Sequence, residues 1–195
     1  GGAPLRVVGQ PLEARAGVDG AVARSLTAFH GLPNNHTYAA AVMNGRIWIG
    51  TLGGVAEVEG LRIGRVFTTS DSALPHNWVN ALVPFEGRLY VGSRSGWAAS
   101  LWSGVVVFEA GATGDARPLR TLAGGSIYDN TGSPERLALD SHDSLYVRSG
   151  VIAVFAPGAT GASEPARHIM RTVPGRQFAT IHSPQLFALD RHDTL

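Results

Sequence analysis

Hydrophobic and polar positions alternate in short stretches along the chain, and glycine, proline or serine separates one stretch from the next. Residues 46–52 and 88–93 alternate bulky apolar side chains with small or polar ones, and a glycine-containing pair precedes each run. Residues 105–108 and 151–155 are β-branched or aromatic runs between turn residues. Alternation with a period of two is typical of half-buried strands. The pattern therefore predicts many short β-strands.

The predicted strands recur at a fixed spacing in the first half of the chain. Residues 32–35, Leu-Pro-Asn-Asn, return at residues 74–77 as Leu-Pro-His-Asn. Residues 45–50, Gly-Arg-Ile-Trp-Ile-Gly, return at residues 87–92 as Gly-Arg-Leu-Tyr-Val-Gly. Both pairs are 42 positions apart (74 − 32 and 87 − 45). Two separate motifs that keep one offset indicate an internal repeat.

The second half repeats at a slightly longer spacing. Residues 107–114 return at residues 154–161, an offset of 47, and residues 137–145 return at residues 187–195, an offset of 50. These periods fit four-stranded propeller blades, and they are too long for leucine-rich repeats. The sequence also lacks the amphipathic period of helical repeats.

The predicted fold class is all-β, a single β-propeller domain, or a fragment of one, built from four-stranded antiparallel blades. Blade-like units are expected at residues 36–69, 78–123 and 135–173, with a partial unit at residues 184–195. Their inner strands are expected at residues 36–43, 78–85, 135–140 and 185–190. Residues 4–9 and 23–29 are expected to form outer strands before the first unit.

About four units leave open sheet edges, which proteins avoid exposing. Three explanations stay open. The chain is a slice of a larger propeller, which the stop in the middle of a repeat favours; the N-terminal strands complete the last unit; or the open edges pair with a second copy of the chain.

Composition narrows the function classes. The 16 basic and 15 acidic residues give a net charge of +1, so we expect no nucleic-acid partner. No apolar run approaches the ~18 residues that span a bilayer, so we expect no direct membrane insertion. The absence of cysteine excludes disulfides, thiolate metal sites and cysteine nucleophiles. The motifs predict no cofactor and no bound metal.

Two parts of the chain resemble known propeller repeats. Residues 29–96, with Gly-Leu-Pro-Asn-Asn followed by Ile-Trp-Ile-Gly-Thr-Leu-Gly-Gly, resemble two-component-regulator propeller repeats. Residues 104–195, with Val-Phe-Ala-Pro-Gly-Ala-Thr-Gly and Leu-Ala-Leu-Asp, resemble NHL-type repeats, although Asp143-Ser144 and Asp193-Thr194 replace the usual Gly-Asn. The resemblance implies a noncatalytic module for ligand sensing or protein interaction in a periplasmic or secreted, sensor-type protein.

The connections between an outer strand and the next inner strand carry polar and aromatic residues. By the geometry of these families they reach the mouth of the central channel, where such groups suit a sugar-like small molecule or a peptide. A structural interpretation is that asparagine and proline shape the turn. The ligand-binding candidates at this rim are Asn34, Asn35, His36, His76, Asn77 and Trp78, together with Trp97 and Trp102 between the two repeat types.

Other side chains have two interpretations each. Asp140, His142 and Asp143, repeated as Asp190, His192 and Asp193, have the residue types of a divalent-metal site, but each set is better explained as a turn capped by its first aspartate. Trp48 is expected in the core between blades. The arginines of the outer strands are expected to be solvated; they are Arg117, Arg120, Arg167 and Arg171.

Two further functions stay open. One is a propeller enzyme of the lactonase or polysaccharide-lyase kind, with a metal or histidine in the channel, for which the candidate side chains are Glu135, His36, His76 and His182. The other is a propeller fragment or recombined chain without activity of its own.

Overall fold

The computed structural model describes residues 5–7, 15–16, 22–94, 104–109, 111–113, 115–123, 134–149, 151–161, 163–169, 187–190 and 192–194. Four positions singled out in the sequence, Trp97, Trp102, Arg171 and His182, lie outside these ranges. No helix among the described residues is long and apolar enough to cross a membrane.

Three four-stranded antiparallel sheets make up most of the described chain. The first contains β4 (Thr37–Met43), β5 (Arg46–Thr51), β6 (Gly54–Glu59) and β7 (Arg62–Phe67). The second contains β8 (Trp78–Phe85), β9 (Arg88–Arg94), β10 (Gly104–Glu109) and β11 (Arg120–Ala123). The third contains β12 (Arg136–Leu139), β13 (Leu145–Arg148), β14 (Ile152–Phe155) and β15 (Arg167–Ile169). Each strand pairs with its neighbours in chain order.

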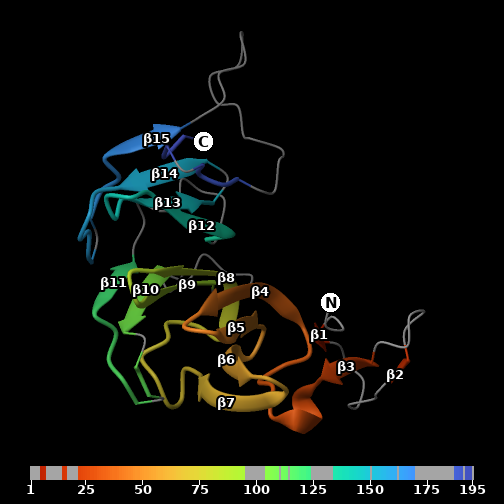
Figure 1. The fold of residues 1–195 in the computed structure, drawn as a ribbon. Coiled ribbons are helices and arrows are strands. Elements are labelled where there is room, and N and C mark those ends of the chain that lie inside the picture. Colours follow the sequence, from red (N-terminus) through yellow and green to blue (C-terminus); the bar gives the residue numbers. More distant parts are fainter. Residues whose placement is uncertain are drawn as a thin grey trace, which may run out of the picture.

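The sheets are arranged as propeller blades. The first strand of each sheet packs against that of the next, so that β4 contacts β8 and β8 contacts β12. Figure 1 shows the three sheets following one another, each running from its inner strand to an outer strand. The all-β propeller fold predicted from the repeats is confirmed. We number the sheets blades 1, 2 and 3.

Tight turns explain the glycine pairs of the repeat. Asn44 and Gly45, which join β4 to β5, have φ values of 52° and 73°. Glu86 and Gly87, which join β8 to β9, have φ values of 47° and 72°. Two successive residues in the left-handed region are typical of the hairpin turn that matches the twist of antiparallel strands. The same kind of turn therefore closes the inner hairpin of blades 1 and 2.

A second repeated glycine lets the blades approach each other. A Cβ atom on Gly50 of β5 would lie 2.8 Å from Cγ1 of Val79, on the inner strand of blade 2. A Cβ atom on Gly92 of β9, the equivalent position, would lie 3.2 Å from Cβ of Pro134, just before the inner strand of blade 3. The absence of a side chain at this position thus sets the spacing between successive blades.

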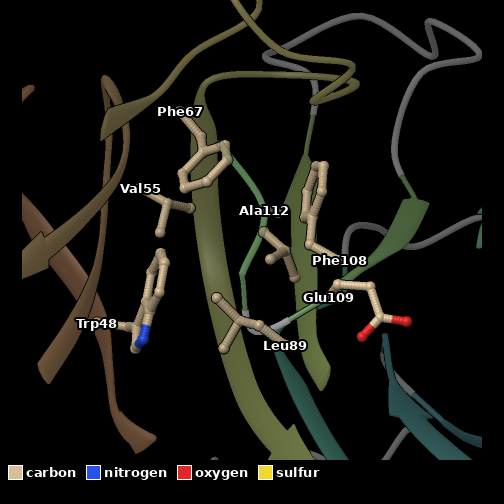
Figure 2. A pocket seen from close by; sticks show the side chains of 8 residues that line it. Trp48, Val55, Phe67, Leu89, Phe108, Glu109 and Ala112 are labelled. Atoms are coloured by element: carbon tan, nitrogen blue, oxygen red, sulfur yellow. The ribbon is translucent and has the colours of Figure 1, made fainter. Parts of the chain in front are cut away.

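Apolar side chains fill the space between blades 1 and 2. Trp48 and Phe67 of blade 1 lie with their ring centroids 5.8 Å apart, and Phe67 lies 5.4 Å from Phe108 of blade 2. Figure 2 shows these rings and Leu89 pointing toward one another, with the Glu109 carboxylate pointing away from them. Trp48 is buried, so its predicted place in the core between blades is confirmed.

Blade 1 also contains a buried charged group. The Glu57 side chain on β6 is only 1% exposed. It accepts hydrogen bonds from Arg65 Nε at 2.7 Å and Arg65 Nη2 at 2.8 Å, and from Arg46 Nη1 at 2.8 Å. The hydrogen bonds from Arg65, followed by those from Arg46, lower the pKa of Glu57 to about 2 against the opposing effect of burial.

Two arginines of the outer strands lie at the seams between blades. Arg65 Nη1 donates to the backbone carbonyl of Ala112 in blade 2. Arg120 Nη2 donates to Asp143 Oδ2 at 3.1 Å, in the β12–β13 turn of blade 3. The expectation that Arg120 is solvated was wrong, because its side chain is only 17% exposed. Arg167 is exposed, as expected, and its Nη2 also donates to the hydroxyl of Tyr146 in the same blade at 3.2 Å.

The N-terminal prediction needs correction. Residues 23–29 were expected to form one strand, but β3 (Val22–Leu26) ends before a short 3-10 helix, η1 (Ala28–His30). Thr27 causes the change: its Oγ1 accepts a hydrogen bond from Phe29 N at 3.3 Å, and its own N–H donates to His30 Nδ1 at 3.1 Å. Gly31, with φ 95°, ends the helix.

The N-terminal strands form a small sheet of their own. β1 (Leu5–Val7) pairs in parallel with β3, and β2 (Arg15–Ala16) pairs antiparallel with it. None of these described strands pairs with blade 3. Blade 3 is not the partial unit at residues 184–195, so the alternative in which the N-terminal strands complete that last unit stays a prediction.

The C-terminal segment covers blade 3 without forming the expected strand. Residues 187–190 are extended chain outside any sheet, although residues 185–190 were predicted to be an inner strand. Phe187 and Leu189 nevertheless pack against Tyr146, Ile152 and Val154 of blade 3. The segment thus shields an apolar blade face while its backbone has no strand partner among the described residues.

Candidate functional site

Several of the predicted rim residues use their side chains to hold the backbone. Asn35 Oδ1 accepts a hydrogen bond from Ala28 N at 2.7 Å, and Asn77 Oδ1 accepts one from Thr69 N at 2.7 Å. Each bond ties the connection between blades to the element before it. The ligand-binding role of these two residues stays a prediction, and the turn uses one of the two lone pairs of each oxygen.

The preceding positions are used in the same way. Asn34 Oδ1 accepts from His36 N at 2.8 Å, and His76 Nδ1 accepts from Trp78 N at 3.0 Å. Burial, and then the nearby charge of Arg94, lower the pKa of His76. The lowered pKa favours the neutral ring, which this hydrogen bond requires because only an unprotonated nitrogen can accept.

A hollow of about 230 Å³ lies where the inner strands of the three blades begin. β4, β8 and β12 all contribute to it, together with the last residue of β9. Of the predicted rim residues, it contains Trp78. Its lining residues are Tyr38, Trp78, Asn80, Arg94, Glu135 and Arg136.

Aromatic and cationic side chains form one wall of the hollow. The rings of Tyr38 and Trp78 lie 5.5 Å apart at an angle of 43°. The Arg94 guanidinium lies 3.9 Å from the centre of the Trp78 ring, a cation–π contact. Tyr38 is 41% exposed, an unusual degree for a large apolar ring. Blade 1 therefore presents an aromatic surface to solvent beside a positively charged group.

Buried polar atoms at the hollow have no hydrogen-bond partner among the described residues. They are the side-chain oxygen of Asn80, Nε1 of Trp78 and Nε of Arg94. Asn80 is only 7% exposed. Leaving such an atom unpaired costs roughly 1–3 kcal/mol, so native structures usually satisfy it with protein, water or a ligand. These atoms have the chemistry to receive a hydroxylated or charged small molecule.

The charges around the hollow are unevenly paired. The Glu135 carboxylate forms an ion pair with Arg148 Nη1. Arg136 Nη1 donates to the backbone carbonyl of Glu135 at 2.9 Å. Neither Arg136 nor Arg94 has a carboxylate partner within the described part of the chain. The hollow is therefore positively charged on balance.

The paired aspartate turns have a structural role. Asp140 Oδ1 accepts from His142 N at 2.9 Å and Ser144 N at 2.8 Å, and Asp190 Oδ1 accepts from His192 N at 2.8 Å and Thr194 N at 2.9 Å. This is the predicted cap by the first aspartate of each set. Across the described residues, no three histidine, aspartate or glutamate side chains are grouped to hold a metal ion.

The second aspartate of each turn contacts the neighbouring blade. Asp143 Oδ1 accepts from the hydroxyl of Tyr90 in blade 2. Asp193 Oδ2 accepts from Ser141 Oγ of blade 3 at 2.6 Å. The repeated turn thus caps itself and joins its unit to the preceding one.

Sequence reasoning missed four lining residues as ligand candidates: Tyr38, Asn80, Arg94 and Arg136. It named Glu135 only for the enzyme alternative. These residues come from strand ends in different blades and belong to no shared motif. One signal was available: Asn80 and Arg94 are polar residues in strands whose other positions are mostly apolar.

Comparison with known proteins gives distant structural likenesses. No protein-family model matches the sequence, and no curated protein matches it. A solved structure, the extracellular domain of the putative hybrid two component system BT3049 from B. thetaiotaomicron, is similar with a TM-score of 0.46 and 21% identity. The match covers 63% of this chain and 16% of that chain, so this chain corresponds to a small part of the matched protein.

Proposed function

We propose that this chain is a noncatalytic propeller module that binds a small ligand at the hollow where β4, β8 and β12 begin. The observation that carries the proposal is the cluster of buried polar atoms without partners in the described residues, beside an exposed aromatic ring. Aromatic faces stack on apolar ring faces, and amides and guanidiniums supply directional hydrogen bonds. A sugar-like molecule or the end of a peptide has both features.

The resemblance of the repeats supports a sensing role. Two-component-regulator and NHL-type repeats occur in periplasmic or secreted proteins, and residues 29–96 and 104–195 resemble them respectively. We therefore propose a periplasmic or extracellular location, with ligand binding as the signal. A structural change on ligand binding at the hollow would act on all three blades, because each blade contributes its inner strand to the hollow.

The test is ligand binding measured by thermal shift and isothermal titration calorimetry. The probes are neutral and acidic monosaccharides, hydroxy acids and dipeptides. We expect at least one class to raise the melting temperature and to bind with a stoichiometry of one. The Tyr38→Ala variant should weaken that binding about fivefold, since the loss of an aromatic contact costs about 1 kcal/mol.

Phe29→Ala is the matched control. Phe29 is 85% exposed on η1, and it does not line the hollow. Its removal should leave binding unchanged. The proposal is wrong if no probe binds, or if Tyr38→Ala and Phe29→Ala affect binding equally.

A further inference from the structure

The hollow has features that select among ligand classes. Its two guanidiniums that have no carboxylate partner among the described residues, Arg94 and Arg136, come from different blades. A guanidinium presents a planar fork of donors that matches an oxyanion, and it remains charged at any physiological pH. Arg94 is held in place over Trp78, so little side-chain entropy is lost when it binds a partner.

The third charged group does not choose between a single and a double negative charge. Glu135 lies at the same hollow, and its carboxylate is already paired with Arg148. Each Coulomb interaction grows in proportion to the charge of the ligand, so Arg94 and Arg136 attract a dianion more strongly to the same degree that Glu135 repels it more strongly. The net positive charge of the hollow therefore fits an oxyanion, either a carboxylate or a phosphate monoester.

The remaining features describe what accompanies the charge. The oxygen of Asn80 can only accept, so it requires an N–H or O–H donor on the ligand. Trp78 Nε1 can only donate, so it requires an acceptor. The volume of about 230 Å³ leaves room for one small molecule.

We infer that the hollow binds a small hydroxylated oxyanion, a carboxylate or a phosphate ester, with Arg94 and Arg136 holding the charged group and Asn80 accepting a hydrogen bond from a hydroxyl. This inference rests on the proposed function, since it names the ligand class of the same site. An acidic monosaccharide and an open-chain hydroxy acid share this chemistry. They differ in whether a ring face stacks on Tyr38.

The experiment measures calorimetric affinities of the whole chain for four probes: glucuronate, glucose, gluconate and a glucose phosphate. Glucuronate and glucose share a ring and differ in the carboxylate, whereas gluconate keeps a carboxylate without the ring. We expect glucuronate to bind at least about tenfold more tightly than glucose, as for one charge-assisted interaction. If gluconate binds about as tightly as glucuronate, the ligand class is an open-chain hydroxy acid. If gluconate binds more weakly, the ligand class is an acidic monosaccharide whose ring stacks on Tyr38.

Variants then assign the carboxylate to its partners. Arg136→Gln and Arg94→Gln should each reduce glucuronate affinity about tenfold and reduce glucose affinity much less. Arg94→Lys keeps the charge over Trp78 and should lose less. Arg62→Gln, at an exposed position on β7, is the matched control and should change neither affinity. Thermal melting confirms that each variant is folded.

The outcomes separate this inference from the proposed function. Equal binding of glucose, glucuronate and the glucose phosphate would overturn the oxyanion assignment and leave a ring-binding module. Tighter binding of the glucose phosphate than of glucuronate would identify the oxyanion as a phosphate, and the reverse order would identify it as a carboxylate. Glucuronate affinity that is unchanged in both glutamine variants would also overturn the inference. If none of the probes binds, the inference is wrong, and the broader panel of neutral sugars and dipeptides decides the proposed function.

Discussion

The buried carboxylate of Glu57 gives the sharpest prediction about stability. Its side chain is 1% exposed and accepts hydrogen bonds from both Arg65 and Arg46. A pKa that falls from the usual 4.5 to about 2 means that the folded state favours the ionised form. By linkage this contributes about 3 kcal/mol to the free energy of unfolding at neutral pH.

The pH dependence follows from the direction of the change. The folded-state pKa is lowered, so the contribution is complete above pH 4.5 and is lost as the pH falls toward 2. About 2 of these 3 kcal/mol should be gone by about pH 3. The Glu57→Gln variant cannot ionise there, and it should be destabilised by roughly 3–5 kcal/mol at pH 7, since it leaves Arg65 without its carboxylate.

The assay is urea denaturation of the wild type and Glu57→Gln from pH 7 to pH 3. The difference in unfolding free energy between them should shrink by about 2 kcal/mol over this range. Glu59→Gln is the control: that side chain is 70% exposed, lies 3.5 Å from Arg46 Nη2, and should change stability by less than about 1 kcal/mol. A difference between wild type and Glu57→Gln that stays constant with pH would refute the reasoning.

Two further predictions concern the seams between blades. Gly50→Ala places a Cβ 2.8 Å from Val79 Cγ1 and should lower the free energy of unfolding by about 1–3 kcal/mol in urea denaturation. Gly111→Ala is the control, because no atom lies within 4 Å of the new Cβ, and it should lower the free energy of unfolding much less. Equal losses in the two variants would contradict the blade contact at Gly50. Burial, followed by the hydrogen bond to Asp143, raises the pKa of Tyr90 to about 12. An ultraviolet titration should therefore show a tyrosine that ionises near pH 12 in the wild type and is missing in Tyr90→Phe. The free energy of unfolding should fall between pH 10 and pH 12, because the tyrosine ionises first in the unfolded state. An unchanged titration curve in the variant would show that Tyr90 is not the late tyrosine.

The repeats made the blades predictable. A strand that alternates apolar and small residues must present one face to each neighbouring blade, and the glycine at the equivalent positions Gly50 and Gly92 marks the close approach. The predicted inner strands at residues 36–43 and 78–85 accordingly lie within one residue of β4 and β8. Local pattern and packing agree in these segments.

Segments governed by single side chains were not predictable in the same way. Residues 23–29 have strand-like composition, yet hydrogen bonds at Thr27 turn the chain into η1. Residues 187–190 have a strand-like pattern as well, but they lack a partner strand in the described structure. β-propensity describes how side chains pack on a sheet, so it fails where the neighbouring strand is missing.

The candidate site was only partly accessible from the sequence. Trp78 was identified because it follows a repeated turn, and the turn itself uses the side chains of Asn77 and His76. Arg94 and Arg136 are 42 positions apart and come together only because β9 and β12 belong to adjacent blades. Nothing in one sequence shows which strand ends meet around an axis.

The double role of the aspartate turn has a consequence for how such a chain can change in length. Asp143 and Asp193 each bond to the preceding unit, while Asp140 and Asp190 shape their own turns. Each unit therefore contains the aspartate that caps its own turn and the aspartate that bonds to the preceding unit. Insertion or removal of a whole unit preserves every such junction, whereas a change of part of a unit breaks one. This favours growth by duplication of entire blades.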